Sequence, residues 1–293
     1  MLEAVPNVSE GRDASAIREI GDAFASCAAL LDVHADMDHH RSVFTLAADA
    51  DPLVDSLVAG IARALELVDL RVHDGVHPRV GAVDVVPLVH LVPADVERAR
   101  AAARAVAERV GAELGVPVFL YGTVGGGNRP AFFRSGGLPE LGRRVEAGEL
   151  RVDAGPSRLD PRSGALLVGA RSPLVAYNVV LGAADAAVAR SIAASIRESG
   201  GGMPGVQAIG LELPRSGRIQ VSMNVLDLER APLHEVVERV RQEAARHGAR
   251  LVDGELVGLV PERVLADAAA AGVAVPGVDE SRVLERALRS ALL

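Results

Sequence analysis

The sequence predicts an α+β protein built from two ferredoxin-like units in tandem, each a split βαβ motif whose antiparallel sheet is covered by helices. Three observations support this fold class. The 293 residues are enough for two domains. Both halves follow the order strand, helix, strand, strand, helix, strand, and each ends with a trailing helix. The ends of the halves also resemble each other, because VPLVHLVPADV at 86–96 is echoed by LVGLVPERV at 256–264.

In the first half, apolar spacing and flanking residues predict each element. A short apolar run at 2–6 ends in the loop PNVSEGR, after which Asp13 is expected to cap a helix. Pro87 suggests an edge or bulge in the last strand, and Pro93 suits the first turn of the helix that follows. The remaining elements are expected as strands at 28–34, 42–47 and 82–91 and as helices at 52–68 and 93–114.

The second half repeats this order. Its runs of apolar and β-branched residues predict strands, and its alanine-rich or amphipathic stretches predict helices. A turn around Ser216 and Gly217 joins the two central strands. The strands are expected at 173–181, 206–213, 218–226 and 255–260, and the helices at 183–198, at 233–247 and from Pro261 onward.

Residues 115–170 connect the halves and are rich in Gly, Pro and Arg, as in YGTVGGGNRPAFFRSGG and DAGPSRLDPRSGA. A connection of this length is more often functional than passive. The glycines at 125–127 lack the spacing of a dinucleotide-binding loop, so a flexible loop or lid is expected over 122–137. The predicted domains are residues 1–170 and 171–293.

Composition excludes several classes of function. The net charge is −8 and aromatic residues make up 2% of the chain, which disfavours a nucleic-acid partner. All 31 basic residues are arginine. The absence of lysine excludes Schiff-base catalysis, lysine-anchored pyridoxal phosphate and the lysine of a phosphate-binding P-loop.

Cys27 is the single cysteine, so an intrachain disulfide and a CxxC metal site are excluded. Its alanine-rich surroundings predict a small buried side chain. Uncharged runs are shorter than the ~18 residues of a membrane span, and the N-terminus has no secretory pattern. We therefore expect a cytoplasmic protein with no membrane partner.

Histidines are concentrated in two segments, LDVHADMDHHR at 31–41 and RVHDGVHPRVGAVD at 71–84. One interpretation is a metal-dependent hydrolase that uses the His and Asp residues between 34 and 77. His73 and His77 are four residues apart, which would aim two imidazoles at one metal ion on a helix. Gly75 and Pro78 argue against a helix there, so no metal is expected.

The other interpretation is acid–base catalysis by His77. Pro78 stiffens the backbone behind this histidine, and a neutral imidazole accepts protons near pH 7. Arg79, two residues on, would lie on the same side of an extended chain and could clamp a carboxylate. The alternative is a purely structural role, in which His77 caps a loop and Arg79 forms a surface ion pair.

Several segments resemble the formiminotransferase family. They are VPNVSEGRD at 5–13, LLDV and HRSV around 30–43, HPRVGAVDVVP at 77–87, and later AGPSRLDPRSGA, VGARSPLVAYNVVL, VQAIGLEL, QVSMNVLD and ELVGLVP. The resemblance covers nearly the whole chain. It implies two ferredoxin-like subdomains in a homodimer without a cyclodeaminase domain. The implied reaction moves a formimino group from N-formimino-L-glutamate to N5 of the co-substrate tetrahydrofolate in histidine catabolism.

The resemblance also assigns residues to roles. The catalytic histidine falls on His77, and Arg79 and Arg41 are expected to bind substrate carboxylates. The folate-binding stretch falls on Gly155, Pro156, Ser157, Arg158, Leu159, Asp160, Pro161, Arg162, Ser163 and Gly164.

Three positions depart from the family pattern. His34 stands where the family has Asp, His40 where it has Asn, and Val76 where it has Glu. A carboxylate that orients the catalytic imidazole is thus absent at 76, and Asp36 or Asp74 is expected to substitute. The alternatives are a related formyl or formimidoyl transferase with another donor or acceptor, the hydrolase described above, and a non-enzymatic folate carrier.

Overall fold

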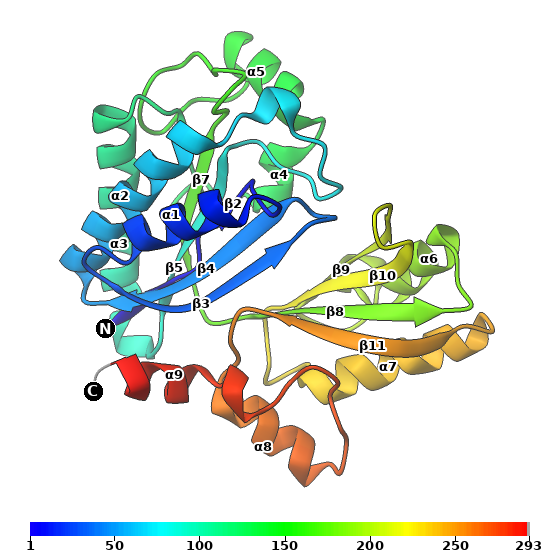
Figure 1. The fold of residues 1–293 in the computed structure, drawn as a ribbon. Coiled ribbons are helices and arrows are strands. Elements are labelled where there is room, and N and C mark those ends of the chain that lie inside the picture. The colour runs from blue at the N-terminus through cyan, green and yellow to red at the C-terminus, as the bar shows by residue number, and fades with distance from the viewer. Residues whose placement is uncertain (292–293) are drawn as a thin grey trace. The chain divides into compact units, whose positions relative to one another are not determined.

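The computed structural model describes residues 1–291 and divides into two compact units, with the boundary between Ser172 and Pro173 (Figure 1). Each unit has its own sheet, helices and apolar core. The predicted α+β class with tandem subdomains is therefore confirmed. In the described residues, no helix has both the length and the apolar character needed to cross a membrane.

The sheet of the first unit begins with a split ferredoxin-like core. Two short strands, β1 and β2, form one interrupted central strand that pairs with β4 on one side and β5 on the other. The interruption falls at Pro6, which has no N–H to donate. The strands of the unit are β1 (Leu2–Ala4), β2 (Asn7–Val8), β3 (Ala29–Asp36), β4 (Arg41–Ala48), β5 (Val83–His90), β6 (Val118–Gly122) and β7 (Leu166–Arg171).

Beyond β5 the sheet continues with β7 and then β6, and both new pairings are parallel. This differs from the expectation of an antiparallel sheet with an irregular connection over 115–170. LLVGAR and VFLYG are short apolar runs without alternation, which is the pattern of parallel strands buried on both faces. A parallel pairing also requires a crossover, and the long helix α3 (Val96–Glu113) provides it.

Helices α1 (Ala14–Phe24), α2 (Ala50–Leu67) and α3 share one apolar core with the sheet of the first unit. Asp13 caps α1 as predicted, because its carboxylate accepts hydrogen bonds from the backbone N–H groups of Ser15 and Ala16. Phe24 packs against Gly60 of α2, where a side chain's Cβ atom would lie 2.0 Å from the ring.

A smaller core contains Phe119, Tyr121 and Leu167 from the sheet, with α4 (Pro130–Arg134) and α5 (Gly137–Glu146) supplying Phe133 and Leu141. The loop or lid expected over 122–137 is therefore partly helical. Cys27 is exposed, so its predicted burial is wrong. Helix α1 ends at Phe24, and Cys27 lies in the turn that follows.

The second unit has the ferredoxin-like order β11-β8-β10-β9, with every pairing antiparallel. Strand β11 starts earlier than predicted, because its pairing with β8 continues on both sides of a bulge between Leu251 and Asp253. Tyr177 is buried in the core and donates a hydrogen bond to the carbonyl of Pro276. The elements are β8 (Val175–Gly182), α6 (Ala186–Ile196), β9 (Val206–Leu213), β10 (Arg218–Val225), α7 (Leu233–Arg246), β11 (Arg250–Val257), α8 (Glu262–Ala270) and α9 (Leu284–Ala291).

Candidate active site

Four histidines from the two histidine-rich segments lie together in the first unit. His39 and His40 form the turn between β3 and β4, while His73 and His77 lie in the loop that leads to β5. The rings of His39 and His77 meet edge to face with centroids 5.9 Å apart. The rings of His40 and His73 stack with centroids 4.1 Å apart. The fold thus joins segments that are almost 40 residues apart in the chain.

His77 is held with one defined nitrogen available for chemistry. Its Nδ1 atom lies 2.8 Å from the carbonyl oxygen of Pro78. Because a carbonyl only accepts, Nδ1 carries the proton and donates, which leaves the lone pair on Nε2. Desolvation lowers the pKa of His77 well below its usual value, and the positive charges of Arg41 and Arg134 lower it further. The imidazole is therefore neutral at pH 7 and can accept a proton.

Arg79 fastens the His77 loop to the β3–β4 turn. Its guanidinium donates to the carbonyls of His77 at 2.7 Å, His39 at 2.8 Å and His40 at 3.2 Å, and it also contacts the His73 ring. These contacts engage donors on all three guanidinium nitrogens, with Nε donating to the His77 carbonyl at 3.1 Å. The sequence predicts that Arg79 binds a substrate carboxylate, whereas in the structure it donates hydrogen bonds to backbone carbonyls of its own chain.

His73 also helps to hold the His77 loop against the β3–β4 turn. Its Nε2 donates to the carbonyl of His40 at 2.8 Å, and its Nδ1 accepts from the backbone N–H of Gly75 at 3.1 Å. Desolvation, together with the neighbouring Arg79, lowers the pKa of His73 to about 4. Gly75 is required here because a Cβ atom would lie 2.2 Å from the carbonyl oxygen of His39. His73 therefore positions the loop in its neutral form.

The two carboxylates expected to orient His77 have other partners. Asp36 accepts from His39, with Oδ2 3.0 Å from Nδ1. Burial alone would raise the pKa of Asp36, but the hydrogen bonds and charge of His39 outweigh it and lower the pKa to about 2. Asp74 pairs with Arg12 and lies 3.4 Å from Nδ1 of His40. The group that orients His77 is thus the carbonyl of Pro78.

Arg134 of α4 is a site residue to which the sequence assigned no role. It forms an ion pair with Asp84, whose side chain is only 4% exposed. The other oxygen of Asp84 accepts the backbone N–H of Val80 at 2.8 Å. This bridge joins α4 to the end of the His77 loop and brings the charge of Arg134 near His77. The only available signal was a short arginine-bearing helix opened by Pro130 within the glycine-rich segment.

The predicted folate-binding segment 155–164 is attached to the same loop. The backbone carbonyl of Ser163 accepts a hydrogen bond from the N–H of Ala82 at 2.8 Å. The carbonyl of Val80 accepts one from the N–H of Ala165 at 2.9 Å. Gly164 has φ +71°, and a Cβ there would lie 2.1 Å from the Val80 carbonyl oxygen, so only glycine fits. Residues 155–158 and 160–162 are exposed, so the segment presents a surface beside the His77 loop.

Comparison with known proteins gives the family. Residues 1–171 match the formiminotransferase domain, N-terminal subdomain, and residues 176–274 match the formiminotransferase domain. The chain belongs to the formiminotransferase family. A glutamate formimidoyltransferase of Thermoplasma acidophilum is 39% identical over 99% of this chain and 98% of that one.

Two further relatives show how this formiminotransferase chain compares in length. A glutamate formimidoyltransferase of Streptococcus pyogenes is 35% identical over 92% of each chain. A formimidoyltransferase-cyclodeaminase of Gallus gallus is 38% identical over 92% of this chain but only 52% of its own length.

The hydrolase interpretation receives no support from these relatives. In residues 1–291, no group of three or more His, Cys, Asp or Glu side chains is arranged to hold one metal ion. His73 and His77, four residues apart, lie in a loop with Gly75 and Pro78, and each bonds to a different carbonyl. These two histidines of the formiminotransferase chain are held by backbone carbonyls instead.

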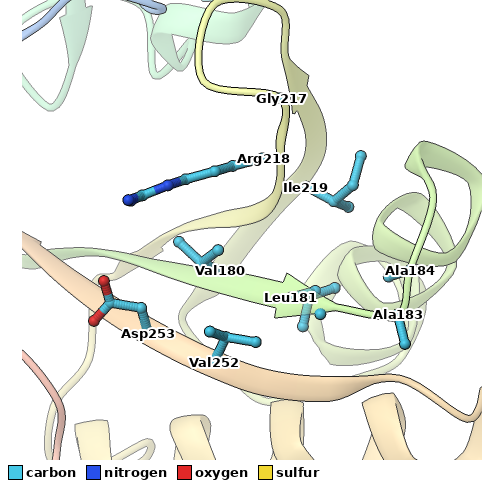
Figure 2. Close-up of a pocket in the computed structure, with 10 residues that line it drawn as sticks. Val180, Leu181, Ala183, Ala184, Gly217, Arg218, Ile219, Val252 and Asp253 are labelled. Carbon is cyan, nitrogen blue, oxygen red and sulfur yellow. The ribbon is translucent and has the colours of Figure 1, made fainter.

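A separate hollow of about 410 Å³ lies in the second formiminotransferase unit. Figure 2 shows Arg218 reaching across Val180 of β8, with Asp253 on the neighbouring strand. Apolar side chains such as Leu181, Ile219 and Val252 form much of its lining. It contains none of the site residues predicted from the sequence.

Proposed function

We propose that this chain is a glutamate formimidoyltransferase, a folate-dependent enzyme that moves a formimino group from N-formimino-L-glutamate to N5 of tetrahydrofolate. The observation that carries the proposal is His77, a neutral imidazole with its basic Nε2 defined by the Pro78 carbonyl. It lies in the family's His-Pro-Arg segment. Relatives that bear this enzyme's name at 39% and 35% identity support the assignment.

In the proposed mechanism, Nε2 of His77 acts first as a base. It accepts the proton that N5 of tetrahydrofolate loses as N5 forms a bond with the formimino carbon. The bond between that carbon and the glutamate nitrogen then breaks, and His77 returns the proton to the departing nitrogen. His77 is thus unchanged after one turnover, and proton transfer of this kind contributes ~10²–10⁴ in rate.

Arginines are proposed to hold the carboxylates of the two substrates. Arg158 is exposed on the segment 155–164 and is suited to the glutamyl tail of the folate. Arg162 shares that segment but also donates to the carbonyl of Glu66 at 2.9 Å. Arg41 is charged and near enough to His77 to lower the pKa of that histidine. We propose that Arg41 binds the carboxylate of formimino-glutamate. Arg79 is proposed to position the loop.

Membership of the family supports a proposal about the biological setting. We propose a homodimer that acts in the cytoplasm in histidine catabolism, with two subdomains in each chain that meet near residue 170. Light scattering coupled to size-exclusion chromatography tests the dimer, because a single species at twice 30.4 kDa is expected. A species of 30.4 kDa would exclude it.

The activity is tested by incubating the purified protein with N-formimino-L-glutamate and tetrahydrofolate and following both products by mass spectrometry. Free glutamate and a tetrahydrofolate carrying the formimino group should appear together in equal amounts. Parallel reactions with formyl-glutamate and with other amine acceptors test the alternative transferases. Folate binding without turnover would indicate a carrier, and activity lost to a chelator would indicate the hydrolase.

A further inference from the structure

Arg134 on α4 carries a guanidinium that its partners in the fold engage only in part. Its Nη2 forms the ion pair with Asp84, and within residues 1–291 this is the only hydrogen bond of its side chain. The Nε atom is buried and has no hydrogen-bond partner. A guanidinium has five N–H donors, and a buried N–H without an acceptor is rare in folded proteins. Arg134 therefore has donors available for an acceptor from outside the chain.

The position of Arg134 is fixed from two directions. Asp84 holds the guanidinium, and the other oxygen of this carboxylate accepts the Val80 N–H at 2.8 Å. The helix is held by Arg144 of α5, which lies 4.2 Å from the centre of the Phe132 ring and donates to the Phe132 carbonyl at 3.0 Å. A cation held in this way loses little conformational freedom when a ligand binds to it.

Arg134 belongs to a group of cations around His77. After burial, the charges of Arg41 and Arg134 lower the pKa of His77 most. Burial lowers the pKa of Arg79 to about 10, and the same two charges add to this effect against the opposing charge of Asp84. Like charges this close repel one another, and an anion that binds among them relieves the repulsion. Arg79 is engaged with backbone carbonyls, which leaves Arg134 as a second cation beside Arg41 for the anionic groups of a ligand.

We propose that Arg134 is a specificity-determining residue that binds one carboxylate of the donor while Arg41 binds the other. N-formimino-L-glutamate carries two carboxylates, and neither takes part in the bonds that form and break at the formimino group. Two separate cations near the base therefore select a dicarboxylate and hold it at both ends. The role in specificity for the donor rests on the proposed function, whereas the binding of a dicarboxylate does not.

The first test measures binding without turnover. Glutarate has two carboxylates with the same number of bonds between them as in glutamate, and butyrate has one. Calorimetry should show that the wild type binds glutarate at least ~10-fold more tightly than butyrate, because a second charged hydrogen bond contributes that much. Arg134→Gln should lose this preference. The matched control is Arg143→Gln on α5, which removes an exposed arginine paired with Glu140 and Glu149 and should keep the preference.

The second test compares three donors. N-formimino-L-glutamine lacks the side-chain carboxylate of formimino-glutamate, and N-formimino-4-aminobutyrate lacks the α-carboxylate. The wild type should use each analogue with a kcat/KM at least ~10-fold lower than that for formimino-glutamate. Arg134→Gln should lose the preference over one analogue and keep it over the other, which identifies the carboxylate that Arg134 binds. A purely structural role would instead lower kcat/KM for all three donors by the same factor.

The variant Arg134→Gln leaves the buried Asp84 without its cation, which is destabilising. If it does not fold, the double variant Arg134→Gln/Asp84→Asn replaces it in both tests. This variant removes both charges of the ion pair, and the Asn oxygen can still accept the Val80 N–H.

Three results would overturn the inference. They are a wild type that binds glutarate no better than butyrate, an unchanged preference for glutarate in the folded variant, and an equal loss with all three donors. A wild-type protein with no transferase activity would refute the proposed function, whereas the binding measurements would still decide whether Arg134 binds a carboxylate.

Discussion

The Nδ1 atom of His77 lies 2.8 Å from the Pro78 carbonyl, and this contact selects which nitrogen is basic. The carbonyl belongs to the next residue, whose φ is fixed by its ring. Arg79 then holds the carbonyl of His77 through two guanidinium nitrogens. The three residues of the His-Pro-Arg segment therefore have separate roles. Pro78 stiffens the backbone, Arg79 anchors the loop, and His77 is the proposed base.

Arg79→Lys tests whether Arg79 anchors the loop or binds substrate. A lysine keeps the charge but cannot reach three carbonyls with a planar fork. We expect kcat to fall at least ~10-fold and the thermal midpoint to drop, with little change in KM, because a loop held by several partly buried hydrogen bonds is released. Steady-state kinetics and calorimetry measure both. A raised KM for formimino-glutamate with unchanged kcat would instead support the carboxylate clamp.

Substitutions of Arg158 and Arg162 separate ligand binding from structure within the segment 155–164. Arg158→Ala should raise the KM for tetrahydrofolate ~10-fold or more, since a lost charged hydrogen bond costs ~1.5–3 kcal/mol. Its stability should be unchanged. Arg162→Ala should also lower the thermal midpoint, because Arg162 bonds to Glu66. Unchanged folate affinity in both variants would show that neither arginine anchors the ligand.

At the scale of elements, the local sequence pattern predicts the strands and helices of the antiparallel cores. It does not predict the strands at the edge of the first sheet beyond β5. Asp13, apolar spacing and turn residues mark α1 and the strands that follow it. Strands β6 and β7 are short apolar runs embedded in Gly, Pro and Arg. Only the pairing of β7 with β5, and of β6 with β7, distinguishes them from loop. The bulge that lengthens β11 likewise depends on its partner β8.

The packing of α1 on α2 is tested by Gly60→Ala. The added methyl would overlap the Phe24 ring, which lies 2.0 Å from the Cβ position, so we expect a loss of ~1–3 kcal/mol in the free energy of unfolding. Gly142→Ala in α5 is the control, because no atom lies within 4 Å of its Cβ position. It should be neutral or stabilising by ~0.4–1 kcal/mol. Chemical denaturation gives both values, and equal effects would contradict the packing described.

At the scale of the whole molecule, the sequence identified the two histidine-rich segments, the family and His77 as the candidate base. It could not predict which side chains pair, because those contacts form only when the β3–β4 turn meets the loop 73–82. Asp36 was expected to orient His77 but binds His39 instead. Arg134 is held at the site by its ion pair with Asp84, which tethers α4. Tertiary contacts of this kind leave no local pattern in a single sequence.

The central claim is that neutral His77 is the proton acceptor, and the kcat of His77→Gln across pH tests it most directly. In the wild type, kcat should rise with pH as the imidazole loses its proton and reach a plateau. Because burial and the arginines lower the pKa of His77, the inflection should lie below ~6.5. A folded His77→Gln protein should bind both substrates and lose ~10²–10⁴ in kcat at every pH on the plateau. Retention of more than about a third of wild-type kcat would contradict the claim, since loss of a general base costs at least ~10².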